Sequence, residues 1–273
     1  MPPERRLEAS QLCAVDVNSV LKVLTLNTGT WIQIEMYSGV DDQNFRALRH
    51  RAAGGPPFII VDSALPPGPN AIDVGGPALA NTWYYLYGID GSPGTLPMAG
   101  LLSTALEAPY GPGPIMPPGY DLMRRVAAVR TDALGAFLEF RKFGQFALYD
   151  DYTKNLVYTG NTPGPVPIPI SVANYVPATS ERVLLLVEIW DIVGVPFFVP
   201  EFIDIYSEHI GPVPIGPTFG VRAATSFPGA TQANVISGWA HTGGNVYITG
   251  TGSPDSFVNI YVLGYWEDMA PAI

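Results

Sequence analysis

Cysteine and histidine are scarce in this chain of 273 residues, which has one cysteine, Cys13, and three histidines. One cysteine cannot form a disulfide within the chain, and a cysteine-ligated metal site needs several thiolates. One thiol and three imidazoles also leave few side chains for nucleophilic catalysis. We therefore expect a protein that folds without disulfides in a reducing cytoplasm, uses no metal or other cofactor, and is not an enzyme.

Charged side chains are also few, at 14% of the residues, against about 25% in an ordinary domain. So little charge predicts a surface with few charged groups, and large exposed apolar patches are usually interfaces. We expect a homo-oligomer or an assembly subunit; the alternative is a monomer whose surface is covered by serine, threonine and asparagine. The net charge is −10, and residues 155–273 hold only Arg182 and Arg222 against nine acids. Such an acidic chain is not expected to bind nucleic acid.

Long hydrophobic runs are missing as well. No stretch approaches the roughly 20 apolar residues that a membrane span requires. The first ten residues, MPPERRLEAS, are charged and are not followed by an apolar run of signal-peptide length. Neither membrane insertion nor export by the usual route is therefore expected.

What the chain does contain is 29 glycines, 28 prolines and many short runs typical of strands. LKVLTL and WIQIEMYS flank a short turn at 27–30 and predict a β-hairpin. RRVAAVRTD and AFLEFRKFG are predicted to pair around the turn at 133–135, and VLLLVEIW is predicted to be a central strand. The pattern predicts an all-β fold of two antiparallel, jelly-roll-like β-sandwich domains, at 1–159 and 170–273, joined by a Pro-rich connector at 160–169.

The pentapeptide GPVPI occurs twice, at 164–168 and 211–215. Proline locks φ and supplies no N–H, so these segments are predicted to be stiff, extended connectors or edges. A stiff arm loses little conformational entropy when it docks on a neighbour. The residues that we expect to form partner-contact arms are Arg5, Arg6, Arg49, Pro165, Pro167, Pro212 and Pro214.

The sequence gives little indication of catalytic or metal-binding groups. Asp204, Glu208 and His209 form the densest cluster, but in a strand His209 points away from the two acids. Neighbouring acids such as Asp150–Asp151 and Glu267–Asp268 are interpreted as solvated turn residues. No nucleophile elbow, phosphate-binding loop or dinucleotide fingerprint occurs.

Aromatic residues cluster in two segments, around Trp83–Tyr87 and around Tyr261–Trp266. Three interpretations are open for them: core packing is favoured, followed by a subunit interface and then a ligand platform. The residues that could form an interface or platform are Trp83, Tyr85, Tyr87, Tyr265 and Trp266.

Three consecutive segments carry a resemblance to a known group of proteins. They are NTWYYLYGIDGS (Asn81–Ser92), AGLLST (Ala99–Thr104) and PPGYDLMRRVAAVRTDALGAFLEF (Pro117–Phe140). In order and spacing they resemble a segment of tailed-bacteriophage virion structural proteins. The match spans about 60 residues, is interrupted by a proline-rich insertion at 109–118, and carries no catalytic residue.

The resemblance implies a non-enzymatic structural protein that is made in the host cytoplasm and resides in the virion. We expect a symmetric oligomer, a trimer, associated with the tail or a fibre and contacting other virion proteins. A decoration protein on the capsid surface is the alternative. A second alternative is an adhesin that holds host-surface glycan on its aromatic residues. An enzyme acting on glycans would need two carboxylates about 5–10 Å apart in a cleft.

Overall fold

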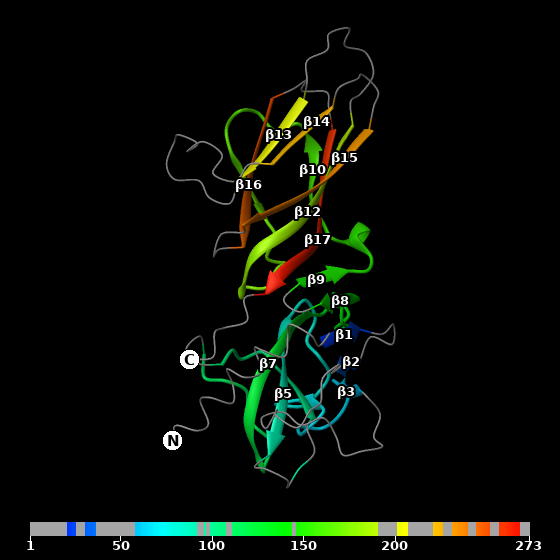
Figure 1. Cartoon of the computed structure of the whole chain (residues 1–273), viewed down its shortest axis with the longest axis vertical. Helices are drawn as coiled ribbons and strands as arrows, with labels where there is room; N and C mark the ends of the chain where they lie inside the picture. The colour runs from blue at the N-terminus through cyan, green and yellow to red at the C-terminus, as the bar shows by residue number, and fades with distance from the viewer. Residues whose placement is uncertain are drawn as a thin grey trace. The chain divides into compact units, whose positions relative to one another are not determined.

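The computed structural model describes strands and loops over much of the chain (Figure 1). The described residues are 21–25, 31–36, 58–91, 96, 99–107, 111–143, 146–190, 201–206, 221–225, 231–239, 244–251 and 257–267. These ranges hold strands β1 to β17, one short 3-10 turn and no α-helix. Nothing in them forms a helix long and apolar enough to cross a lipid bilayer. The prediction of an all-β fold is confirmed.

The chain divides into two compact units. The first comprises Met1–Ala147 with Met269–Ile273, and the second comprises Leu148–Asp268. The sequence had suggested a boundary at the Pro-rich segment 160–169. That segment lies within the second unit, between strands β10 (Leu156–Asn161) and β11 (Ile168–Ser171).

One sheet of the first unit is built around a long central strand. Its strands, in order, are β4 (Ala71–Ile72), β6 (Ala99–Ser103), β5 (Trp83–Gly91) and β7 (Tyr120–Arg130). β5 runs antiparallel to both neighbours, while β4 and β6 are parallel. The three segments that carry the phage resemblance thus supply three adjacent strands of one sheet.

The other strands of the first unit include the predicted hairpin. They are β8 (Phe140–Phe143), β1 (Leu21–Thr25), β2 (Trp31–Met36) and β3 (Phe58–Asp62), paired in that order. The hairpin of β1 and β2 is confirmed. The predicted pairing of AFLEFRKFG with the preceding strand is wrong beyond its first residues: Leu138 N–H still bonds to Arg130 O, but β8 pairs with β1.

Both faces of β5 are buried. Residues 84–89 are all buried, and since neighbouring side chains of a strand point to opposite faces, each face must be covered. On one face Tyr85, Tyr87 and Ile89 form a cluster against which Leu106 and Met116 pack. On the other face the ring of Tyr84 meets that of Phe137 edge to face, with 6.2 Å between centroids. Loop residues at 106 and 116 therefore take part in the covering that a helix provides in other folds.

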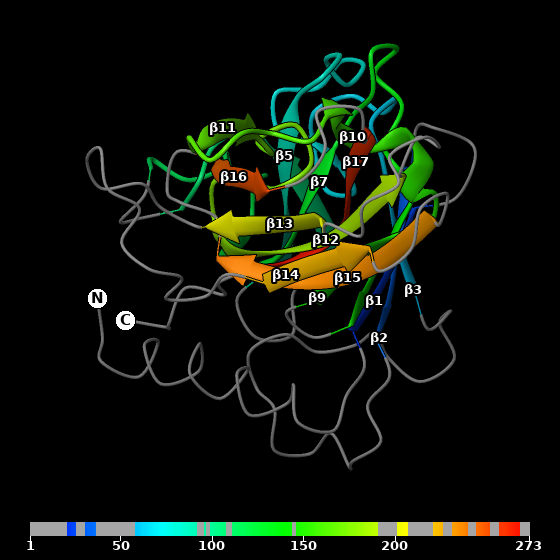
Figure 2. The same cartoon turned by 90° about the horizontal axis from the view of Figure 1, so that it is seen from above.

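The second unit has two sheets. In the first, β12 (Ser180–Trp190) lies between β15 (Thr231–Trp239) and β17 (Phe257–Glu267), and β10 pairs with the other side of β17. The second sheet has the order β11, β16 (Asn245–Thr251), β13 (Glu201–Tyr206) and β14 (Val221–Thr225). β13 and β14 run side by side in Figure 2. The predicted central strand VLLLVEIW is confirmed as part of β12.

Alternate residues of β12 face the interior of the second unit. Val183, Leu185, Val187 and Ile189 are fully buried, whereas Arg182 and Trp190 are exposed. In the other sheet Ile203, Ile205, Val246 and Ile248 are buried as well, and β14 contacts β12 and β15. The two sheets thus bury alternating apolar faces, an arrangement consistent with a β-sandwich.

The first GPVPI segment is tied to the second sheet next to a glycine. Gly250 N–H donates to Gly164 O at 3.2 Å. A Cβ at Gly250 would lie 2.6 Å from Pro163 O and 3.1 Å from Ile203 Cδ1. The chain at 162–164 therefore approaches β16 so closely that only glycine fits at position 250.

We predict that Gly250→Ala lowers the free energy of unfolding by about 1–3 kcal/mol, because the added methyl overpacks this approach. Urea denaturation of the purified variant measures the loss. Gly164→Ala is the matched control, since a Cβ at Gly164 would meet no atom within 4 Å. Equal stability of both variants would show that the segment does not lie against β16 in solution.

Candidate functional site

Most of the aromatic residues proposed as a platform lie inside the fold. Tyr85, Tyr87 and Tyr265 are 7%, 0% and 1% exposed, and Trp83 packs against the cluster that contains Tyr85 and Tyr87. The rings of these three tyrosines are core, as the first interpretation of the sequence had it. Trp266 is half-buried and lies elsewhere, beside Arg182, whose guanidinium carbon is 5.1 Å from the ring centroid.

A buried polar network holds the loop that follows β6. The hydroxyl of Tyr87 lies 2.9 Å from Ala105 O and 2.8 Å from Glu107 Oε2. Glu107 Oε1 in turn lies 3.3 Å from Arg125 Nη1, and Arg125 stacks over the ring of Tyr85. Burial, and then the hydrogen bond and charge of Glu107, raise the pKa of Tyr87 far above its ordinary value. The network anchors residues 105–107 to the sheet.

A second anchor is the buried carboxylate of Asp73. Its Oδ2 accepts hydrogen bonds from Ser103 Oγ at 2.7 Å and from Ile115 N–H at 3.0 Å. Ser103 Oγ also accepts a bond from Ala105 N–H. These charged and polar groups tie loops to strands.

Four large apolar side chains project from the anchored loops of the first unit. Val74, Leu79, Ile115 and Leu134 are 66%, 63%, 64% and 92% exposed. We call these four residues the anchored apolar tips. Two of them belong to the Asp73 region, because Val74 follows Asp73 and Ile115 is bonded to its carboxylate.

The other two tips stand on loops that are hydrogen-bonded together. Leu79 N–H donates to the hydroxyl of Tyr84 at 2.8 Å, and Leu79 O accepts a bond from Thr131 Oγ1. Asp132 Oδ1 accepts from Leu134 N–H at 2.8 Å, while Asp132 O accepts from Asn81 N–H. Both leucines therefore sit on backbones held by hydrogen bonds, yet their side chains face solvent.

The second unit presents a different surface, on the outward side of β12 and β17. Register pairs alternate residues of the two strands on this side. We call these residues the outer face: Arg182 with Trp266, Leu184 with Gly264, Leu186 with Tyr261, Glu188 with Asn259, and Trp190 with Phe257. One predicted platform residue, Trp266, belongs to it.

Aromatic rings lie at several points of the outer face. Trp190, 41% exposed, stacks with Phe257 at 6.5 Å between centroids and 21° between planes. Tyr261 meets Tyr152, from the short 3-10 turn η2 (Tyr152–Lys154), edge to face at 5.7 Å. Burial, then the nearby charge of Glu188, raises the pKa of Tyr261. The sequence reasoning noted Tyr261 but missed Trp190 and Phe257, which stand alone in their segments.

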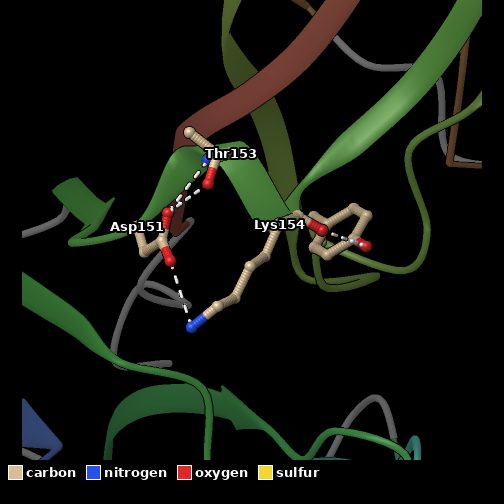
Figure 3. Close-up of polar contacts among 4 residues, drawn as sticks. Asp151, Thr153 and Lys154 are labelled. Carbon is tan, nitrogen blue, oxygen red and sulfur yellow. Dashed lines mark hydrogen bonds and ion pairs between the residues drawn. The ribbon is translucent and has the colours of Figure 1, made fainter.

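The neighbouring acids behave differently from one another. Asp151 is the cap of η2: it accepts bonds from Thr153 and forms an ion pair with Lys154 at 3.0 Å (Figure 3). The hydrogen bonds from Thr153, then Lys154, lower its pKa. Asp151 is a turn acid, as predicted. The same prediction is wrong for Glu267, which is 1% exposed because β17 continues through it and places it in the interior.

Other predicted residues have no established role. Asp204 lies in β13, half-buried, and in the part of the chain that the structure describes no three His, Cys, Asp or Glu side chains meet as metal ligands. Pro165 is exposed and Pro167 half-buried, and between them Val166 is 72% exposed. Outside the described residues lie Arg5, Arg6, Cys13, Arg49, Glu208, His209, Pro212, Pro214 and Asp268.

Comparison with known proteins gives no assignment. No protein-family model matches the chain. No curated protein matches its sequence significantly either.

We predict that Glu107→Ala lowers the free energy of unfolding by about 2–4 kcal/mol, because Arg125 then stays buried without its carboxylate partner. Glu107→Gln is the control: its amide oxygen remains an acceptor for Arg125, its NH2 group can donate to the Tyr87 hydroxyl, and it should lose less. Urea denaturation at neutral pH compares the three proteins. If Glu107→Ala were as stable as the parent, the network would not hold the loop.

Alkaline pH is expected to destabilise the protein through its buried tyrosines. Burial raises the pKa of Tyr87 and of Tyr265 in the folded state, whereas an unfolded tyrosine ionises near pH 10. Each such tyrosine contributes stability that is fully present below pH 10 and is lost as the pH rises above it, by about 1.4 kcal/mol per pH unit.

The measurement is the unfolding free energy between about pH 9 and pH 11 for the parent, Tyr87→Phe and Tyr265→Phe. Each substitution should reduce the steepness of the loss, since one titrating group is gone. An unchanged slope in both variants would mean that these hydroxyls ionise freely in the folded protein.

Proposed function

We propose that this chain is a non-enzymatic structural protein of a tailed-phage virion, associated with the tail or a fibre, and that it works as a symmetric oligomer. The observation that carries the proposal is the set of anchored apolar tips. Val74, Leu79, Ile115 and Leu134 are more than 60% exposed while hydrogen bonds hold the loops that carry them.

Anchored apolar groups suit assembly for two physical reasons. Burying an exposed leucine or valine side chain against a neighbour contributes about 1.5–3 kcal/mol. A loop that is already held in place loses little further conformational entropy when it docks. Single exposed apolar residues are common on monomers, so it is their number, their anchoring and the low charge of the chain that together favour contacts between subunits.

The phage resemblance agrees with this use. It spans residues 81–140, which form β5, β6 and β7 and include two of the tips, Ile115 and Leu134. The polar residues of the same region, Glu107, Arg125 and Asp132, anchor loops and backbone. A segment whose polar groups are used for support is expected of a scaffold rather than of an enzyme.

We further propose that each unit is a jelly-roll-like β-sandwich and that the oligomer is a trimer. The Pro-rich segment 160–169 is a stiff arm whose Val166 side chain, 72% exposed, contacts a partner. The partners are copies of the chain and other virion proteins, and the particle is assembled in the host cytoplasm. A decoration protein on the capsid surface has the same physical requirements and differs only in its partner.

The test is the mass of the purified full-length protein by light scattering over a dilution series. We expect an oligomer, and we expect the double variant Leu79→Ser with Leu134→Ser to dissociate at a concentration at least about 100-fold higher, because two buried leucines are lost. Leu79→Met with Leu134→Met is the matched control, which keeps apolar side chains and should assemble like the parent.

A parent protein that stays monomeric at all concentrations would contradict the proposal, and so would a serine double variant that assembles normally. Co-sedimentation of the parent with empty heads and with isolated tails then separates the two virion positions. Binding to tails supports the tail-associated role, and binding to heads supports decoration.

A further inference from the structure

The outer face of the second unit leaves several side chains of β12 and β17 partly exposed. The inward side chains of β12 are fully buried, whereas Leu184, Glu188 and Trp190 on the outer face keep part of their surface in water. Phe257 and Tyr261 of β17 are half-buried in the same row. Such a face combines flat rings with polar groups, and it lies on rigid, fully paired strands.

The end of the face at Trp190 holds a pair of stacked aromatic rings. Trp190 and Phe257 are register partners whose planes are 21° apart, with 6.5 Å between centroids. Phe257 thus supports the indole of Trp190 from the neighbouring strand. Because Trp190 is 41% exposed, the rest of its indole offers an apolar surface to a ligand.

Two polar side chains lie next to Trp190 and Phe257 on the same face. Glu188 and Asn259 are also register partners, two residues from Trp190 and Phe257, which is about 7 Å along a strand and close to the width of one sugar ring. Asn259 is 7% exposed, and among the described residues its Oδ1 has no hydrogen-bond partner. A buried acceptor without a partner costs free energy, so it points to a hydroxyl or water that satisfies it.

We propose that this end of the outer face is a binding site for a pyranose ring of a neutral glycan. The apolar face of the sugar packs against the exposed part of the Trp190 indole, which Phe257 supports. Its hydroxyls donate to the carboxylate of Glu188, which is also hydrogen-bonded to Tyr261, and, after a small shift of the amide, to Asn259 Oδ1. Hydroxyl donors suit both acceptors without bringing a charge into the site.

Charge disfavours a second copy of the chain as the occupant. Two copies that met about a two-fold axis at this end of the face would bring their Glu188 carboxylates together, and residues 155–273 carry two arginines against nine acids. Like charges buried against each other are costly. The proposal does not rest on the assembly of the protein through its first unit, and the two are tested by different measurements.

The test is saturation-transfer NMR on the full-length protein with methyl glucoside, methyl galactoside, N-acetylglucosamine and lactose, each at millimolar concentration. We expect transfer from the protein to the ring protons of at least one sugar. Trp190→Ala should weaken that binding at least about tenfold, and Glu188→Gln should weaken it less. Trp190→Phe should retain it, because a flat ring remains.

Trp266→Ala is the matched control, since Trp266 lies on the same face at the opposite end of β12 and β17 and should not contact this sugar. Thermal unfolding of each variant shows whether the fold is kept. The proposal is overturned if no sugar of the set binds, or if Trp190→Ala binds as the parent does. Binding of an oligolysine peptide in place of every sugar would also overturn it, assigning the face to a basic partner.

Discussion

The first unit depends on the burial of residues 84–89 of strand β5 on both of its faces. Residues 84–89 are buried on both sides, and the described part of this unit offers no α-helix to lie on either face. Strand β8 lies against this sheet, since Lys142 Nζ donates to Val126 O of β7 at 2.6 Å, and loops supply further cover. A loop can cover a core only if its own backbone polar groups are satisfied. The polar network around Tyr87, Glu107 and Arg125 and the carboxylate of Asp73 meet that requirement.

The same constraint explains the proposed function. A loop that is anchored firmly enough to cover a core presents its outward side chains at defined positions, and here several of these are apolar, such as Leu79 and Leu134. The second unit solves the problem differently. It buries the inward faces of its sheets and leaves the outer face of β12 and β17 half-exposed, with Trp190 and Glu188 among its residues. One unit thus offers contacts suited to assembly, and the other offers a surface suited to a small polar ligand.

The alternation of apolar residues along strands and the residue types at turns made much of the fold predictable. Alternation over WIQIEMY and the apolar run VLLLVEIW identified strands that the structure contains. The pairing of β8 with β1 could not be found in this way, because it joins residues more than 100 positions apart and leaves no local signal. Glu267 was misjudged because it stands beside another acid near the end of the chain, where a solvated turn is common. Trp190 was missed since only register places it next to Phe257.

Hydroxyl-radical footprinting of the oligomer against the diluted protein shows whether the anchored apolar tips are assembly contacts. We expect labelling of Leu79 and Leu134 to fall strongly on assembly, while labelling of Trp190, on the outer face, stays the same. Unchanged labelling of both leucines in a protein that does assemble would mean that the tips are not subunit contacts. Loss of labelling at Trp190 would place the subunit contact on the second unit instead.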